Sequence, residues 1–200
     1  MSMYVSWKLP LALLLGITTI QSYSQVAPAA RSGNIPLSIG GGITDDSLDW
    51  GPGRRMLGVT AWVDWHFGDQ IRLLRGIGIE AEGTDLNWNR PSDLPKMRHD
   101  TAQGGLTYTW KRFRNLDPYM KMLGGVGSID FPAMPSFPYY THDTFYIFSP
   151  GGGAEYRIRG PIWARGDYEY QFWHQTFGPH DLNPNGFTIG ATYHFGDRPR

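Results

Sequence analysis

The 200-residue chain contains no cysteine, which excludes disulfide bonds, thiolate metal sites and a lipid-modified cysteine. It also has no excess of charge, because 18 Lys and Arg balance 18 Asp and Glu. A nucleic-acid-binding surface needs surplus Lys and Arg to neutralise phosphates, so no nucleic acid is expected as a partner. The length suits a single domain with its own core.

Long apolar runs are also missing, except for one near the N-terminus. Lys8 precedes the apolar residues 9–20, and small and polar residues follow, which is the order of regions in a secretory signal peptide. The run is too short to span a hydrocarbon core, which needs about 20 apolar residues. We therefore expect residues 1–24 to be a signal peptide for Sec export, with cleavage as late as residue 29. Residues 31–200 would then form the mature domain.

The remaining sequence shows little helical periodicity. Apolar and polar residues instead alternate with period two, in stretches of about ten residues separated by clusters of Gly, Pro, Asn and Asp. In the clearest stretch, Tyr168 and Tyr170 flank Glu169. The alternation predicts eight strands, over residues 35–44, 56–66, 75–84, 101–111, 119–128, 145–157, 162–172 and 186–195.

The predicted connections alternate in length. Those after the odd-numbered strands are long (45–55, 85–100, 129–144 and 174–185), and those after the even-numbered strands are shorter (67–74, 112–118 and 158–161). Long outer loops and short periplasmic turns are typical of outer-membrane barrels. We therefore expect an all-β fold, an eight-stranded antiparallel up-and-down transmembrane β-barrel with both termini periplasmic.

The direction of the apolar faces separates this fold from a soluble barrel. Apolar side chains point inward in a soluble barrel, whereas they meet lipid in a transmembrane barrel and polar side chains fill the lumen. Aromatic residues lie on the apolar faces, mostly toward strand ends, as is typical of rings at membrane–water interfaces. The predicted interface aromatics are Trp65, Tyr108, Trp110, Tyr168, Tyr170, Phe172, Tyr193 and Phe195.

The polar faces carry charges of both signs. An eight-stranded lumen is just wide enough for side chains to fill it, and buried charges persist only when they are paired. A near-neutral mixture of acids and bases would meet this condition and pass little beyond water or small ions. The predicted lumen charge network consists of Asp64, Glu80, Glu82, Lys111, Lys121, Glu155, Arg157, Arg165, Asp167 and Glu169.

The last predicted strand, residues 186–195, reads Gly-Phe-Thr-Ile-Gly-Ala-Thr-Tyr-His-Phe. In this strand, and in residues 151–157 and 163–170, the chain resembles the OmpA-like and OmpX-like families of small outer-membrane β-barrels. The resemblance implies an integral protein of the bacterial outer membrane with a structural or surface-recognition role. It also implies outer-membrane lipid and lipopolysaccharide as surroundings, and the barrel-assembly machinery as a partner during biogenesis.

Two other functions stay open on the sequence alone. His174 has Glu169 and Asp181 nearby in sequence, and lipid A deacylases are small barrels that use Ser, His and an acid near the membrane surface. A nucleophilic hydroxyl needs a base within reach, and no Ser lies near His174, so no catalytic residue is expected. The other alternative is a soluble periplasmic binding barrel. No cofactor or metal is expected, and an extracellular ligand would bind through loops 129–144 and 174–185.

Overall fold

The computed structural model describes residues 36–49, 54–67, 76–90, 97–111, 113–130, 142–177 and 180–195. The chain divides into the units Met1–Ser32 and Gly33–Arg200, and all described residues belong to the second unit. The predicted signal peptide and most of loop 129–144 lie outside the described residues. No helix in the described ranges is long and apolar enough to cross a membrane.

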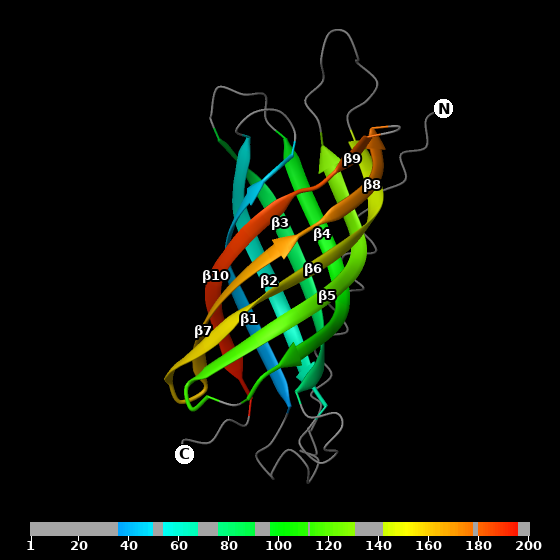
Figure 1. Cartoon of the computed structure of the whole chain (residues 1–200). Coiled ribbons are helices and arrows are strands. Elements are labelled where there is room, and N and C mark those ends of the chain that lie inside the picture. Colours follow the sequence, from blue (N-terminus) through cyan, green and yellow to red (C-terminus); the bar gives the residue numbers. More distant parts are fainter. Residues whose placement is uncertain are drawn as a thin grey trace, which may run out of the picture. The chain divides into compact units, whose positions relative to one another are not determined.

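Every element formed by the described residues is a β-strand (Figure 1). The strands are β1 (Leu37–Ser47), β2 (Arg55–His66), β3 (Ile77–Arg90), β4 (Arg98–Thr109), β5 (Leu116–Asp130), β6 (His142–Arg159), β7 (Ile162–Tyr170), β8 (Phe172–Phe177), β9 (His180–Leu182) and β10 (Asn185–His194).

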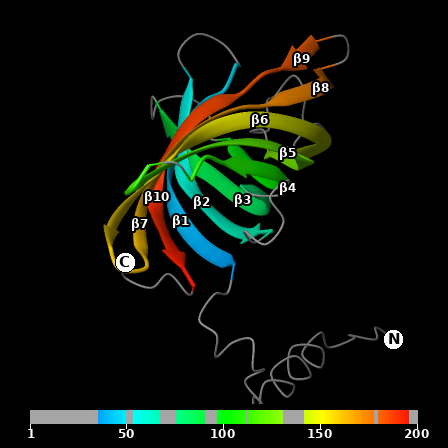
Figure 2. The same cartoon turned by 60° about the horizontal axis from the view of Figure 1, so that its bottom comes forward.

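Antiparallel pairing closes these strands into a barrel. Each of β1 to β6 pairs with the next strand along the chain, and β10 pairs with both β7 and β1. The short strands β8 and β9 pair with each other, and β8 also pairs with β6 (Figure 2). The closed ring therefore has eight strands, which confirms the predicted fold class.

The strands reach further than predicted at one end of the barrel. We call this the loop end, and we call the end where β1 begins and β10 finishes the terminal end. β3 continues to Arg90 and β6 already begins at His142, both inside predicted loops. Consequently the β2–β3 connection at the terminal end, residues 67–76, is longer than the connections 48–54 and 91–97 at the loop end. The predicted alternation of connection lengths is wrong here, because polar residues on both strand faces were read as loop.

Side chains alternate between the two faces of the barrel wall in the predicted sense. Ile79, Leu106 and Ile189 are 44%, 60% and 62% exposed, whereas Thr60 and Thr188 on the opposite faces are buried. Apolar side chains thus cover the outside and polar ones fill the inside. This finding excludes the soluble-barrel alternative, which requires the reverse arrangement.

The ladder along β6 has a gap where its partner changes from β7 to β8. Pairing with β7 runs as far as Gly151–Glu169 and resumes with β8 at Phe148–Phe172, in the same register. Pro150 lies in the gap and has no N–H to donate to a ladder. At the terminal end, Gly160 has a φ of 56°, which permits the tight turn from β6 to β7.

Candidate functional site

A single lysine forms the centre of the lumen. Lys121 is 1% exposed, and its Nζ lies 2.6 Å from Glu82 Oε2 and 3.0 Å from Glu169 Oε2. Asp167 Oδ1 at 3.4 Å and Glu80 Oε1 at 3.5 Å complete its surroundings. Lys121 projects inward from β5, whereas the acids come from β3 and β7, so the ion pairs connect strands across the barrel.

A second cation, Arg165 of β7, occupies the same interior. Its Nη1 lies 3.2 Å from Asp64 Oδ2, and its Nη2 lies 2.9 Å from Glu80 Oε2. The guanidinium also lies 4.5 Å from the ring centre of Trp62 and 4.7 Å from that of Tyr119. Desolvated cation–π contacts of this kind stabilise a buried Arg and fix its orientation.

Acids outnumber cations in this interior, contrary to the near-neutral mixture expected. Uncharged side chains donate hydrogen bonds to some of the carboxylates in place of cations. Tyr119 Oη donates to Asp167 at 2.8 Å, and Gln103 Nε2 donates to Glu169 at 2.9 Å. Hydrogen bonds of this kind lower the cost of burying a carboxylate. The buried acids are Asp46, Asp64, Glu80, Glu82, Glu155, Asp167 and Glu169.

Two predicted members of the network lie elsewhere. Lys111 is exposed in the turn after β4, so its assignment to the lumen is wrong. Arg157 is half-buried near the β6–β7 turn, where its Nε donates to the carbonyl of Gly160 at 3.0 Å and its guanidinium lies over Trp163. Lys111 lies two residues beyond Thr109, the buried last residue of β4, and extrapolated alternation does not detect where the strand ends. The other predicted residues all face the lumen.

Glu155 anchors a separate cluster nearer the terminal end. Thr192 Oγ1 donates to Glu155 Oε1 at 2.7 Å, and His194 Nε2 lies 2.9 Å from Glu155 Oε2. Trp62 Nε1 donates to Thr192 at 3.2 Å. Since Trp62 also packs on Arg165, this cluster is continuous with the charge network.

Toward the loop end, the lumen changes from charged to apolar. Gln171 Nε2 donates to Glu169 at 3.0 Å, and Trp173 Nε1 donates to Gln171 Oε1 at 2.8 Å. Trp173 is completely buried, and its ring contacts that of His99 at a tilt of 44° with 4.7 Å between ring centres. We call the buried apolar layer around these two residues the apolar plug; its other members are Leu48, Met56, Leu86, Met97, Ile129, Ile147 and Leu182.

Space for the plug is made by a glycine. A Cβ on Gly127 would overlap the indole of Trp173, so the absence of a side chain allows the ring to approach the β5 backbone closely. The two ring nitrogens of His99 have no hydrogen-bond partner within the described residues. The loop end of the lumen is therefore filled by well-packed, largely apolar side chains.

Sequence reasoning missed the plug and the rings that stack on Arg165. The alternation of faces along the strands already contained the signal. Trp62 is two residues from Asp64 and therefore on the same face, and Trp173 follows Glu169 and Gln171 at intervals of two. Leu86 likewise continues the inward series of β3, but it lies inside a segment that was predicted to be loop.

The predicted interface aromatics all project outward. Trp65, Tyr108 and Tyr193 are 45%, 38% and 46% exposed and lie close to the terminal end of their strands. Neighbouring rings contact each other, as in the pairs Tyr108–Trp110 and Tyr193–Phe195, both with 5.0 Å between centres. The remaining predicted rings, Tyr168, Tyr170 and Phe172, lie on the part of β7 and β8 that leads to the loop end.

The loop-end rim contains an exposed imidazole–carboxylate pair. His174 Nδ1 lies 3.2 Å from Asp181 Oδ1. In the described part of the chain, no hydroxyl group is hydrogen-bonded to His174, and no group of three or more His, Asp or Glu is arranged to hold a metal ion. The pair supplies two members of a catalytic triad, and the described side chains place no hydroxyl nucleophile beside it.

Closed eight-strand pairing, a polar interior and an exposed apolar belt together define the fold of a small outer-membrane β-barrel. Solved structures agree with this class. Neisserial surface protein A has a TM-score of 0.57 at 9% identity, covering 80% of this chain and 96% of that chain. Ail of Yersinia pestis has a TM-score of 0.53 at 13% identity, covering 78% and 95%. At these identities the likeness extends to the fold. No protein-family model and no curated sequence matches the chain.

Proposed function

We propose that this chain is an integral outer-membrane protein whose closed barrel has a structural or surface-recognition role and does not act as a large pore. The observation that supports this most directly is the filled lumen. Lys121 and Arg165 hold the acids of several strands together at mid-height, and the apolar plug fills the loop end. The termini would face the periplasm and the loop end would face outward, where loops 129–144 and 174–185 could contact an extracellular ligand.

A filled lumen has two consequences for permeability. An eight-stranded barrel offers little more internal space than its side chains occupy. The apolar plug also presents a completely buried Trp173 to any hydrated ion, which would have to lose its water to pass. Both consequences argue against porin-like conduction.

Single-channel recording in planar lipid bilayers tests this proposal. The wild-type protein is expected to show no stable large conductance. Trp173→Ala removes the largest ring of the plug and is expected to produce small, frequent openings. Phe172→Ala is the matched control, because Phe172 is the neighbouring ring on the same strand but points outward. Porin-sized steps in the wild type would refute the closed lumen.

A lipid-modifying enzyme is the second candidate, favoured only by the pair His174–Asp181 at the rim. Incubation of the purified protein with lipopolysaccharide, followed by mass spectrometry of lipid A, tests it. We expect no loss or transfer of acyl chains. Turnover that His174→Ala abolishes and His142→Ala preserves would establish the enzyme instead, since His142 forms a comparable exposed pair with Asp130.

A further inference from the structure

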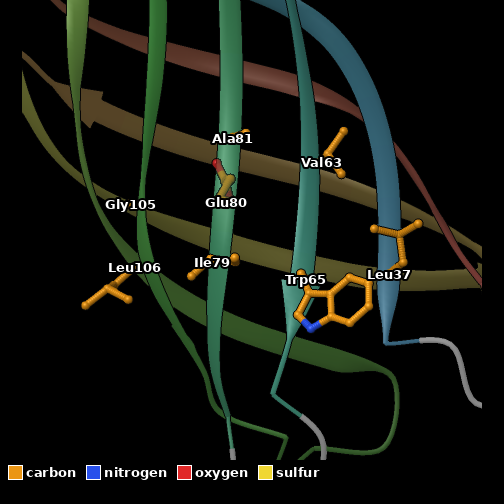
Figure 3. A pocket seen from close by; sticks show the side chains of 8 residues that line it. All are labelled: Leu37, Val63, Trp65, Ile79, Glu80, Ala81, Gly105 and Leu106. Atoms are coloured by element: carbon orange, nitrogen blue, oxygen red, sulfur yellow. The ribbon is translucent and has the colours of Figure 1, made fainter.

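Two acids of the lumen lie directly opposite each other on neighbouring strands. The register of β2 and β3 pairs Asp64 with Glu80, and both side chains point inward and are buried. Figure 3 shows Glu80 on β3 between its outward neighbours Ile79 and Ala81. Residues that face each other in this way have Cβ atoms about 5 Å apart, and like charges at such positions are destabilising. We call these two acids the carboxyl pair.

One guanidinium serves both members of the carboxyl pair. Arg165 Nη1 lies 3.2 Å from Asp64 Oδ2, and Arg165 Nη2 lies 2.9 Å from Glu80 Oε2. Arg165 also has a third acid to compensate, because its Nε lies 2.9 Å from Asp167 Oδ2. Glu80 has a second cation, Lys121, at 3.5 Å. Within the described residues, Arg165 is the only cation in ion-pair contact with Asp64, so the charge of Asp64 is the less well compensated of the two.

The two carboxyl groups are also in hydrogen-bond contact with each other. Ionised carboxylates are acceptors only, so a hydrogen bond between two carboxyl groups requires that one of them carries a proton. The hydroxyl of Ser38 does not supply this donor, because it donates to Asp64 Oδ2, at 3.3 Å. Two carboxyl groups that share one site hold a proton between them, since both cannot be ionised so close together.

Other titratable groups face the carboxyl pair from the neighbouring strands. Glu155 of β6 adds a negative charge near Asp64, and its own partner is His194 Nε2 of β10, at 2.9 Å. His66 is the next inward residue of β2 toward the terminal end. In the described part of the lumen, neither imidazole makes an ion pair with Asp64. Negative charge therefore exceeds positive charge around Asp64.

The permanent cations of the charge network are too few for its acids. Lys121 and Arg165 are the two cations that bind the inward carboxyl groups at this level. The carboxyl groups in ion-pair contact with one or both of them are Asp64, Glu80, Glu82, Asp167 and Glu169. Unbalanced negative charge is costly in a buried site, and a carboxyl group there binds a proton instead of staying ionised.

A buried hydroxyl without a partner lies beside the carboxyl pair. Thr107 of β4 is 5% exposed, and its Oγ1 has no hydrogen-bond partner within the described residues. A Cβ placed on Gly78, the inward residue next to Glu80 along β3, would lie 2.7 Å from this oxygen. Gly105, which pairs with Glu80, leaves the space between them without a side chain. The hydroxyl oxygen can accept a hydrogen bond from a protonated acid, directly or through one water, but not from a carboxylate.

We propose that Asp64 and Glu80 form a proton-binding site that holds one proton at neutral pH, shared between the two carboxyl groups beside Arg165. In the unfolded chain the two acids are apart, and an isolated Asp or Glu releases its proton near about pH 4. Folding therefore takes up one proton. The resulting stabilisation is complete below about pH 4 and is lost as the pH rises to the point where the folded pair releases its proton. The site does not depend on the closed lumen, so conductance measurements leave it unaffected.

Infrared spectroscopy detects the bound proton, because a protonated carboxyl group has a C=O stretching band that a carboxylate lacks. The protein is reconstituted at neutral pH in vesicles of ether-linked lipids, which have no ester carbonyl of their own. We expect Asp64→Asn to remove the intensity of one carboxyl group from this band. Glu80→Gln should remove it as well, since Asp64 then keeps Arg165 for itself and ionises. A carboxyl group that is protonated by burial alone would keep its band in Glu80→Gln.

A matched control lies on the outer face at the loop end. Asp85 and Asp100 are also opposite each other and share one arginine, Arg98, but all three are open to water. Both acids are expected to be ionised at neutral pH, so Asp100→Asn should leave the band unchanged. Heat-modifiable gel mobility verifies that each variant is folded. An unchanged band in Asp64→Asn would overturn the site, and a band that persists in Glu80→Gln would overturn the sharing of the proton.

Urea titration in vesicles measures the uptake of the proton on folding. Between about pH 5 and pH 7, each unit of increase in pH should raise the unfolding equilibrium constant of the wild type tenfold relative to that of Asp64→Asn. This ratio follows from one proton that the folded wild type binds and the variant does not. The same pH dependence in both proteins would contradict proton uptake by the carboxyl pair.

Discussion

Replacement of Lys121 by methionine is the sharpest perturbation of the lumen, because it removes the charge and keeps most of the volume. Its four carboxylate neighbours differ in how many other partners they keep after the substitution. Glu80 keeps Arg165, and Glu169 keeps hydrogen bonds from Gln103 and Gln171. Within the described residues, Glu82 has Lys121 as its only direct partner. The substitution therefore leaves one buried carboxylate without a counter-ion.

Removing one partner of a buried pair costs about 3–5 kcal/mol, because an uncompensated charge remains in the interior. We expect Lys121→Met to lower the free energy of unfolding by that amount at neutral pH. The loss should shrink as the pH falls, since protonation neutralises the carboxylates that lost their partner. Urea titration of the protein in lipid vesicles, followed by heat-modifiable gel mobility, measures the change.

Two further variants isolate the cause. Lys111→Met removes an exposed lysine and should change stability by less than ~0.5 kcal/mol. Adding Glu82→Gln to Lys121→Met should recover part of the loss, because the remaining amide carries no charge. A Lys121→Met variant as stable as the wild type at neutral pH, or no recovery in the double variant, would refute the assignment of Lys121 as the counter-ion of Glu82.

Three other substitutions probe the wall and the plug. Ile189→Arg places a charge on the lipid-facing side and should cost about 2–4 kcal/mol in vesicles; an unchanged urea midpoint would place Ile189 outside the hydrocarbon. His99→Phe replaces a buried imidazole that has no hydrogen-bond partner among the described residues and should raise the midpoint, whereas a lower midpoint would reveal a partner for the ring. Gly127→Ala should displace Trp173 and change its near-ultraviolet circular dichroism. An identical spectrum would show that the barrel backbone moves and the ring stays in place.

The barrel itself was predictable from the sequence because alternation is a local signal. Each strand meets lipid on one face and polar side chains on the other, so Thr188 and Ile189 identify their own faces without reference to other strands. The same logic places Lys121 inside, although its strand is otherwise ambiguous. Closure and antiparallel neighbours follow from short connections between consecutive strands.

The sequence predicted less about the strand ends and the plug. Beyond the hydrocarbon layer, outward positions become polar, as at Asp85 and Asn87, and the contrast between the faces fades. The apolar plug reverses the rule, because Leu86 and Ile129 point inward where the lumen is no longer charged. The partners of Arg165 depend on contacts across the barrel, and alternation along one strand contains no information about them.

The central claim is that the barrel wall has its apolar side outward, and the lack of cysteine makes this directly measurable. Single cysteines at residues 188 and 189 can each carry a spin label, and collision with molecular oxygen can be compared with collision with a water-soluble nickel complex in vesicles. The account predicts high oxygen accessibility at position 189 and low accessibility to both reagents at position 188. Lipid exposure of the label at position 188, with the label at position 189 shielded, would contradict it.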